Sequence, residues 1–222
     1  EFQNKSILLV CGRGGCKASQ SDMLIEKLQS AIRKEGLEEQ IQVILTGCFG
    51  FCAQGPIVKV VPDNTFYVQV KPEDADELIH THFVKKMYLE RLLYLDADRN
   101  QVIRNPEQMS FYKLQMRIAL RNCGMINPES IDEYIARNGY AALAKVLTQS
   151  TPEEAIQEII ESGLRGRGGG GFPTGLKWQI TRKAVKSPKY VVCNADEGDP
   201  GAFMDRSILE GDPHSVIEAM TI

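Results

Sequence analysis

The chain has 222 residues, of which 43% are hydrophobic and 25% are charged, a composition typical of a globular protein with one large or two small domains. Its 26 basic and 29 acidic side chains give a net charge of only −3 and are interleaved along the sequence, which argues against a nucleic-acid or membrane-surface partner. No apolar run approaches the roughly 18 residues of a membrane span, and the first residues lack the layout of a signal peptide, so we expect a cytoplasmic protein without direct membrane contact.

The first 85 residues carry the pattern of a βαββα unit. Four segments are short and apolar enough to be strands, at residues 7–10, 41–45, 57–61 and 66–70. A helix is predicted after the first strand, with Ser19 and Asp22 as its capping box and Gly36 at its end. A second helix is expected from Pro72 to about residue 83. Strands joined through a helix are normally parallel, so the ends of the first two strands should lie at the same edge of the sheet.

Residues 85–105 are charged and aperiodic, and we interpret them as a tether between two parts of the chain. His80 and His82 stand just before this tether, near the end of the predicted helix. Their spacing does not suggest a metal site, so we expect both imidazoles to be solvated.

The second part of the chain begins with helix signals. Asn127-Pro128 and Thr151-Pro152 each place an N-cap residue before a proline, and the second of these helices should end at Gly163. A further helix is expected at residues 175–185, and the first strand of this part at residues 190–193.

Four of the six cysteines stand in the loops that follow the first two strands. They are Cys11, Cys16, Cys48 and Cys52. If the two strands are parallel neighbours, these loops converge and four thiolates face one point. A reducing compartment disfavours a disulfide, and tetrahedral zinc usually has tighter C-x2-C pairs. Because the loops are rich in glycine, whose amides can donate to inorganic sulfide, the residues favour a 2Fe-2S cluster over zinc or inert thiols.

The N-terminal sequence resembles a known family. CGRGGC, followed by TGCFGFCAQGP on a βαββα frame, is similar to the thioredoxin-like 2Fe-2S ferredoxins over about residues 5–85. The resemblance implies that the four cysteines are the cluster ligands, two to each iron. Cys123 and Cys193 fall outside the family pattern, and we expect both to be buried as small apolar side chains.

Residues 164–178, LRGRGGGGFPTGLKW, combine bare main chain with positive charge. The dinucleotide fingerprint needs a preceding strand where a helix is expected, and a Walker loop needs lysine where this chain has Leu176, so neither motif applies. Main chain without β-carbons can approach a flat or anionic ligand closely, and its amides, with Arg167, Lys177 and the start of the next helix, suit phosphates. A flexible linker is the alternative, although linkers rarely carry Phe172 and Trp178 among arginines.

Residues 194–201, NADEGDPG, follow the strand expected at 190–193. Three carboxylates in this short loop would repel phosphate, so they should face hydrogen-bond donors such as a flavin N–H or the hydroxyls of ribityl or ribose. A solvated acidic turn is the alternative. The position at the end of a strand favours a ligand site.

Together the glycine-rich and acidic motifs resemble the NADH- and FMN-binding flavoprotein subunits over about residues 109–222. That family includes the NADH-oxidising subunit of complex I and its relatives in NAD-linked formate dehydrogenases and electron-bifurcating hydrogenases. Gly170 and Asp199 stand where complex I members typically have alanine and glutamate. With the fused ferredoxin, these differences favour the β-subunit type of NAD-dependent iron-only hydrogenases.

The resemblance also implies which residues bind the cofactors. Seven would line the FMN: Gly166, Arg167, Gly168, Lys177, Asn194, Asp196 and Glu197. NADH would lie against Gly169, Gly171 and Phe172, with Lys177 and Asp199 nearby. Ile180 occupies a position where many relatives have a second aromatic residue, which implies weaker clamping of the adenine. The family continues into a ubiquitin-like domain and a 4Fe-4S domain, so a 4Fe-4S cluster is expected only in that region, which this chain does not contain.

The sequence therefore predicts an α/β protein with three parts. Residues 1–86 would form a thioredoxin-like ferredoxin domain, residues 87–108 a linker, and residues 109–222 the first part of a Rossmann-like FMN- and NADH-binding domain, truncated relative to the family.

The function expected is that of an NADH:acceptor oxidoreductase subunit. It would exchange hydride between NAD(H) and FMN and pass single electrons to iron-sulfur clusters, with other iron-sulfur subunits as partners and no catalytic acid or base. The alternatives are a complex I or formate dehydrogenase subunit and a non-catalytic electron-transfer or docking module.

Overall fold

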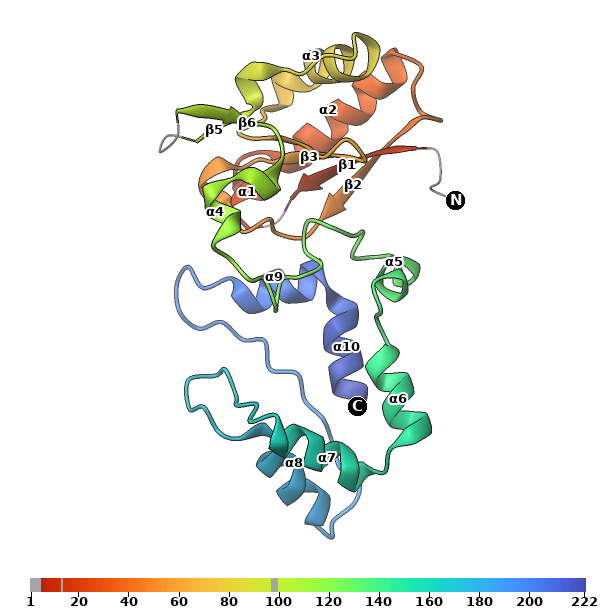
Figure 1. Ribbon diagram of the computed structural model, residues 1–222, viewed down its shortest axis with the longest axis vertical. Helices are drawn as coiled ribbons and strands as arrows, with labels where there is room; N and C mark the ends of the chain where they lie inside the picture. The colour runs from red at the N-terminus through yellow and green to blue at the C-terminus, as the bar shows by residue number, and fades with distance from the viewer. Residues whose placement is uncertain (1–4, 13, 97–99) are drawn as a thin grey trace. The chain divides into compact units, whose positions relative to one another are not determined.

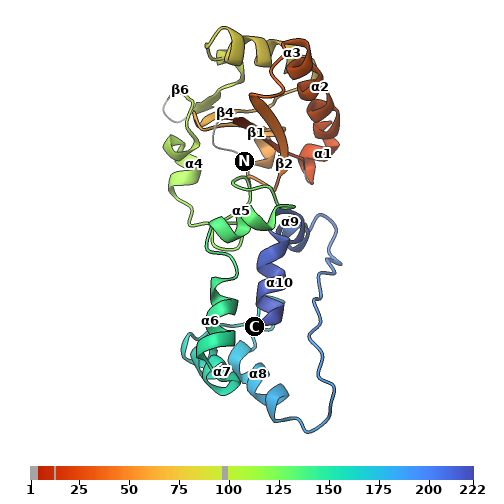
Figure 2. The same cartoon turned by 90° about the vertical axis from the view of Figure 1, so that its right-hand side faces the viewer.

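The computed structural model describes residues 5–12, 14–96 and 100–222, which fall into two compact units (Figures 1 and 2). Unit 1 comprises residues 1–133 and 197–213. Unit 2 comprises residues 134–196 and 214–222. The last part of the chain thus contributes to both units.

Unit 1 is built on a four-stranded sheet in the order β2-β1-β3-β4. Its strands are β1 (Ser6–Cys11), β2 (Ile41–Thr46), β3 (Val58–Val61) and β4 (Thr65–Tyr67). β1 and β2 are parallel, and β3 is antiparallel to both β1 and β4. The predicted order of strands and helices along the chain and the parallel pairing of the first two strands are confirmed.

Alternate side chains of β1 enter two separate cores, as the two-residue period of a strand requires. Leu8 and Val10 pack under α2 (Ser21–Lys34) and α3 (Ala75–Ile79), which Figure 1 shows on the same side of the sheet. Leu9 and Cys11 point to the opposite face, in a cluster that includes Phe49, Phe66, Ile103 and Met109. The first cysteine loop therefore starts from a strand that is buried on both faces.

The first helix begins later than its sequence signal. Gly15–Ala18 forms a separate turn, α1, and α2 starts at Ser21 after Gln20, which takes a left-handed conformation with φ of 67°. No side chain caps α2, so the predicted capping box of Ser19 and Asp22 is wrong. Gly36, with φ of 66°, follows the end of the helix as expected.

His82 is buried rather than solvated. Its Nδ1 lies 2.8 Å from the hydroxyl of Tyr67, and its Nε2 lies 3.3 Å from a carboxylate oxygen of Asp63. Burial lowers the pKa of His82 from its ordinary value, although Asp63 acts in the opposite direction. His80 remains partly exposed and lies 3.0 Å from Glu35. The expectation of a solvated imidazole is therefore wrong for His82, and His80 is the more exposed of the two.

The segment predicted to be an aperiodic tether contains a small hairpin. Its strands are β5 (Tyr94–Asp96) and β6 (Gln101–Ile103), which pair antiparallel. Leu92 and Ile103 are buried against the sheet domain, because the few apolar residues of this charged stretch reach the two cores. A short helix, α4 (Ser110–Lys113), follows. Other single turns lie at Cys52–Gln54, Pro72–Asp74, His80–Val84, Glu90–Leu92 and Pro106–Gln108.

Unit 1 also contains α9 (Met204–Gly211), far along the chain from the sheet. The buried amide of Asn122 donates to the carboxylate of Asp212 over 2.8 Å, which fixes the end of α9 to the segment around residue 122. Asn127 forms a turn by accepting from the amide of Glu129, and α5 (Ile131–Ala136) begins only at Ile131. The helix expected directly at Asn127-Pro128 is therefore wrong by one turn.

Unit 2 is helical. It contains α6 (Ala141–Gln149), α7 (Pro152–Glu161), α8 (Thr174–Lys183) and most of α10 (Pro213–Thr221). Thr151 and Glu154 form the predicted capping box of α7. The carboxylate of Glu218 accepts from the Tyr134 hydroxyl and from the amides of Tyr140 and Leu143, so it caps α6. Burial by itself would raise the pKa of Glu218, but these hydrogen bonds lower it below its ordinary value.

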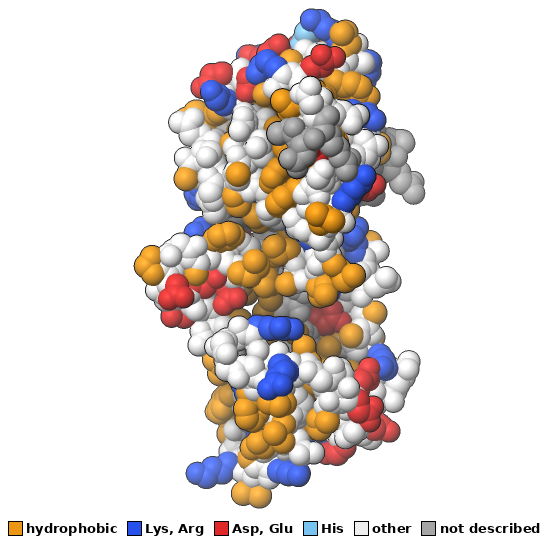
Figure 3. All heavy atoms as spheres, turned by 60° about the vertical axis from the view of Figure 1, so that its left-hand side comes forward, with side chains coloured by type: hydrophobic (Ala, Val, Ile, Leu, Met, Phe, Trp, Pro, Cys, Tyr) orange, Lys and Arg blue, Asp and Glu red, His pale blue; other side chains and the backbone are white. Residues whose placement is uncertain are grey.

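The strand predicted at residues 190–193 is absent from unit 2, where this segment is irregular. Tyr190, Val191 and Val192 are 78%, 68% and 81% exposed. The prediction is wrong because a strand needs a neighbour to pair with, and the described residues of unit 2 supply none. Exposed apolar side chains are common in this protein, and Figure 3 shows them in orange between the charged groups on one face of the molecule.

Candidate functional site

The parallel pairing of β1 and β2 brings the two cysteine loops together in unit 1. Cys11 is in register with Thr46, so the loop after each strand starts at the same edge of the sheet. Cys11, Cys16 and Cys48 are buried, whereas Cys52 is exposed, and all six cysteines of the chain are free thiols.

The four thiols influence one another. Hydrogen bonding with Cys16 raises the pKa of Cys11 to about 11, and Cys11 in turn raises the pKa of Cys48. Burial and the charge of Cys48 raise the pKa of Cys52. The same hydrogen bond with Cys11 lowers the pKa of Cys16. The raised values of the other three are expected where several thiols share one site, because each resists a second negative charge nearby. A bound cation would remove this penalty.

A small cavity of about 260 Å³ opens beside these thiols. It is lined by Gly14, Gly15, Cys48, Cys52, Phe203 and Ser207. The sulfurs of Cys48 and Cys52 are 4.0 Å apart, close to the ~3.8 Å expected for two thiolates on one tetrahedral metal with bonds of about 2.3 Å. The amide of Gly50 donates to the Cys48 sulfur over 3.3 Å, as in sites where main-chain amides stabilise thiolate ligands.

Glycine allows the close packing of this site. A β-carbon at Gly55 would lie 2.5 Å from the Cys16 sulfur, and one at Gly47 would lie 2.7 Å from the main chain of Gly211. The residues present therefore suit a 2Fe-2S cluster by donor chemistry, and the cavity beside Cys48 and Cys52 offers space next to two of the four thiols. No three or more ligating side chains among the described residues are arranged to hold a single metal ion.

Two residues that sequence analysis missed hold the second cysteine loop. The hydroxyl of Tyr112 donates to the carbonyl of Phe49 over 3.0 Å, and the guanidinium of Arg117 donates to the carbonyl of Cys48 over 2.9 Å. Both come from a segment about 65 residues farther along the chain, so no local pattern could indicate them.

Cys123 and Cys193 differ from each other. Cys123 is buried as expected, packed against Gly47 and Gly211, and burial raises the pKa of its thiol to about 11. Cys193 is exposed, so the expectation of a buried side chain is wrong there. Cys193 is exposed because it lies in an irregular segment whose side chains do not pack into a core.

The glycine-rich loop lies in unit 2 between α7 and α8. Its base is closed by an isolated bridge between Arg165 and Pro173 and by the amide of Gly166, which donates to the carbonyl of Phe172 over 2.9 Å. Residues 166–170 are exposed. β-Carbons built at Gly168, Gly169 and Gly170 would meet no atom within 4 Å. The main chain of these glycines is therefore exposed to solvent, shortly before the N-terminus of α8.

The acidic motif is divided between the two units. Asn194 and Asp196 belong to unit 2, where the side chain of Asn194 accepts from the amide of Asp196 over 3.0 Å. Glu197 and Asp199 belong to unit 1, where Glu197 accepts from the amides of Asp205 and Arg206 at the start of α9. Glu197 thus has a helix-capping role in this structure.

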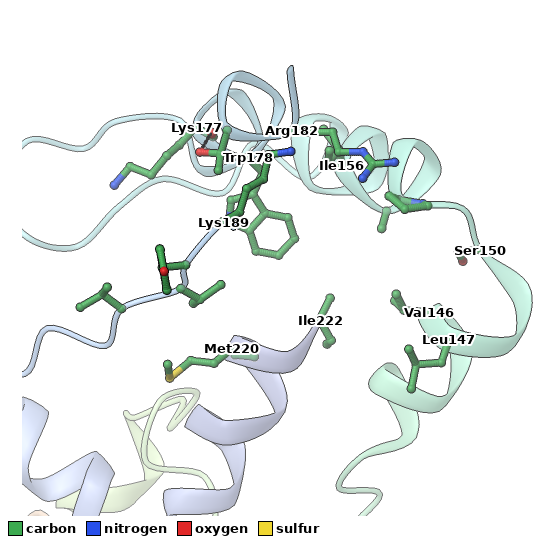
Figure 4. A pocket seen from close by; sticks show the side chains of 17 residues that line it. Val146, Leu147, Ser150, Ile156, Lys177, Trp178, Arg182, Lys189, Met220 and Ile222 are labelled. Carbon is green, nitrogen blue, oxygen red and sulfur yellow. Dashed lines mark hydrogen bonds between the residues drawn. The ribbon is translucent and has the colours of Figure 1, made fainter. Parts of the chain in front are cut away.

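Lys177 and Trp178 of α8 line a groove of about 710 Å³ within unit 2. Figure 4 shows Trp178 on one wall, Val146 and Leu147 of α6 on another, and Met220 and Ile222 on the side that faces Trp178. Arg182 at the edge of the groove forms an ion pair with Glu153 over 2.9 Å, which joins α8 to α7.

In the described part of the chain, no helix combines the length and the apolar character needed to cross a membrane.

Comparison with known proteins identifies both parts of the sequence. Residues 2–82 match the thioredoxin-like 2Fe-2S ferredoxin family, and residues 159–222 match the Nuo51 FMN-binding domain. A solved thioredoxin-like 2Fe-2S ferredoxin from Aquifex aeolicus is 31% identical over 40% of this chain and 89% of that chain, with a TM-score of 0.38.

Two curated relatives share the C-terminal half. An NADP-reducing hydrogenase subunit of Solidesulfovibrio fructosivorans, HndC, is 66% identical over 50% of this chain and 22% of its own length. An NADH-quinone oxidoreductase subunit of Rhizobium meliloti is 50% identical over 47% of this chain and 25% of its own length. The chain therefore spans a quarter or less of these relatives.

The matches confirm the resemblance to both families and the α/β class. The chain is thus similar to the thioredoxin-like 2Fe-2S ferredoxin family over residues 2–82 and to the Nuo51 FMN-binding family over residues 159–222.

Proposed function

We propose that this chain is part of an oxidoreductase subunit that exchanges hydride between NAD(H) and FMN and passes single electrons to iron-sulfur clusters. The observation that carries the proposal is the presence, in one chain, of a four-thiol site and of a bare glycine loop in a segment of the FMN-binding family. One feature suits a one-electron carrier and the other a two-electron cofactor.

The cluster would be held by the thiols of Cys11, Cys16, Cys48 and Cys52. Their support is the shared edge of β1 and β2, the mutual effect of the thiols on their pKa values, and the 4.0 Å separation of one sulfur pair. Burial of three of the four thiols limits the access of water to the cluster.

The flavin and the nucleotide would lie along the glycine loop and the acidic motif. FMN would contact Gly166, Arg167, Gly168, Lys177, Asn194, Asp196 and Glu197. NADH would contact Gly169, Gly171, Phe172, Lys177 and Asp199. The support is the open space beside the loop glycines, the exposed ring of Phe172, which is available for stacking, and the N-terminus of α8.

The chemistry of the proposed reaction belongs to the cofactors, since bound flavin can accept two electrons as hydride and release them singly. The residues of this chain would bind and orient. Exposed main-chain amides and Arg167 would hold phosphate, and the carboxylates of residues 194–199 would accept hydrogen bonds from ring or sugar groups. No side chain needs to act as a general acid or base.

The partners proposed are other iron-sulfur subunits of a soluble complex in the cytoplasm. The 66% identity to a hydrogenase subunit, against 50% to a quinone oxidoreductase subunit, favours a hydrogenase-type complex. Because the hydrogenase relative is described as NADP-reducing, the test includes both NADH and NADPH.

The test uses the intact complex, purified anaerobically and reconstituted with iron and FMN. We expect iron, acid-labile sulfide and flavin to be present, and the flavin absorbance to bleach when NADH or NADPH is added. Iron and sulfide without flavin would indicate a non-catalytic electron-transfer or docking module. Zinc in place of iron would indicate a structural site and would overturn the proposal for the cysteines.

A further inference from the structure

Arg117 places a positive charge beside the cysteine site. Its side chain is half-buried, and its guanidinium donates to the carbonyl of Cys48, one of the four clustered cysteines, over 2.9 Å. The neighbouring carbonyl, of Phe49, accepts from Tyr112. The second cysteine loop is thus held by two donors from the same segment, of which only Arg117 is charged.

The charge of Arg117 is not neutralised by an ion pair. Across residues 5–12, 14–96 and 100–222, no carboxylate lies within ion-pair distance of this guanidinium. Its charge acts on the neighbouring groups, because it lowers the pKa values of Cys123 and Tyr112 against the effect of burial.

Reduction of a 2Fe-2S cluster adds one electron and no covalent bond, so the cluster becomes more negative by one unit. A nearby fixed positive charge stabilises that reduced form more than the oxidised form. In a partly buried site, the interaction is screened by water much less than it would be on an exposed surface.

We propose that Arg117 raises the reduction potential of the cluster held by the four cysteines. Its guanidinium, fixed by the hydrogen bond to the Cys48 carbonyl, places a positive charge beside that cluster. The inference rests on the proposed 2Fe-2S site. If it holds, the segment that carries Arg117, which follows the ferredoxin domain in sequence, helps to set the reduction potential of the cluster.

The test is a potentiometric titration of the full chain with redox mediators, followed by visible absorbance and electron paramagnetic resonance. The Arg117→Gln variant keeps a hydrogen-bond donor and loses the charge. We expect it to shift the ratio of reduced to oxidised cluster at a fixed potential by about tenfold toward the oxidised form, which is about 59 mV for one electron. Arg117→Lys keeps the charge and should stay near the wild-type potential.

Arg121→Gln is the matched control, since Arg121 is exposed and only four residues away. It should leave the potential unchanged. Equal shifts in the two glutamine variants, or equal shifts in Arg117→Gln and Arg117→Lys, would overturn the proposal in favour of a general or structural effect. Iron and sulfide content of the wild-type chain is measured first. A chain without a cluster refutes the proposed site itself, whereas a loaded chain with an unmoved potential refutes only the role of Arg117.

Discussion

The cysteine site of unit 1 and the glycine loop of unit 2 differ in how much the rest of the chain buries and supports them. The cysteine loops leave two paired strands, pack on the core that includes Phe49 and Phe66, and are held by donors from distant segments. The glycine loop is closed only at its base and is otherwise exposed. Of the hydrophobic side chains described in unit 2, only Tyr134 and Ala155 are buried.

The glycines of the two regions have opposite surroundings. In unit 1, Gly47 and Gly55 lie where a β-carbon would collide with protein atoms, so they are required by packing. In unit 2, Gly168 and Gly170 face open space, so packing within this chain does not require them. Glycine that packing does not require, beside arginine and a helix N-terminus, is what a ligand-contacting loop needs.

The largest effect should come from removing a proposed cluster ligand. Cys48→Ala leaves the site with three thiols, and we expect most of the iron, the sulfide and the visible absorbance to be lost. Cys193→Ala, at an exposed cysteine, is the control and should keep about two irons per chain. Metal and sulfide analysis after anaerobic reconstitution measures both. Retention of a full cluster by Cys48→Ala would remove that residue from the ligand set.

A smaller effect is expected at Gly47, where a β-carbon would lie 2.7 Å from Gly211 and 3.0 Å from the Cys123 sulfur. Gly47→Ala should destabilise unit 1 by about 1 to 3 kcal/mol, because two main chains must separate. Chemical denaturation of the cluster-loaded chain measures the change. An unchanged midpoint would show that this close approach is not needed for stability.

Within unit 2, stability should depend on local elements. Thr151→Ala removes the capping box of α7 and should cost about 1 kcal/mol of helix stability. Thr148→Ala is the control, since its hydroxyl donates to the Ala144 carbonyl within α6 and caps nothing. Circular dichroism during urea unfolding compares the two. Equal losses would argue that α7 is held by tertiary packing instead.

A pH effect on stability is expected at His82 of unit 1. Burial lowers the pKa of His82, so the unfolded chain takes up a proton more readily than the folded one. The resulting stability is present above the ordinary pKa of about 6.5 and is lost as the pH falls through the lower folded value. We expect the melting temperature to fall between pH 7.5 and 5.5, and to fall less in His82→Gln. His80→Gln, at a partly exposed position, should behave as wild type.

The smallest effect on stability is expected in the glycine loop. Gly168→Ala adds a β-carbon in open space, so the free energy of unfolding should stay within about 0.5 kcal/mol of wild type. Denaturation of the chain and flavin content of the intact complex are measured together. A large loss of stability would mean that the loop packs within the fold and would weaken the contrast with Gly47.

Much of unit 1 could be read from local patterns. The apolar strands, the turn between β3 and β4 and the crossover helix follow from side-chain period and turn residues, and the parallel pair then places the four cysteines together. The capping box of α7 was equally local, because Thr151 and Glu154 are only three residues apart. These features were predictable because the interactions that fix them lie close together in sequence or follow from general rules of chain connection.

Other features were decided by contacts between distant segments. Whether His82 meets Tyr67 or water, and whether Arg117 reaches the Cys48 carbonyl, depends on packing that no local pattern encodes. The segment at residues 190–193 has the composition of a strand but no partner among the described strands. The sequence alone thus determined many of the local elements, including the strands of unit 1 and the start of α7, and the residue types of both regions. Only tertiary packing decided which of those residues are buried together, because burial and strand pairing require neighbours from elsewhere in the chain.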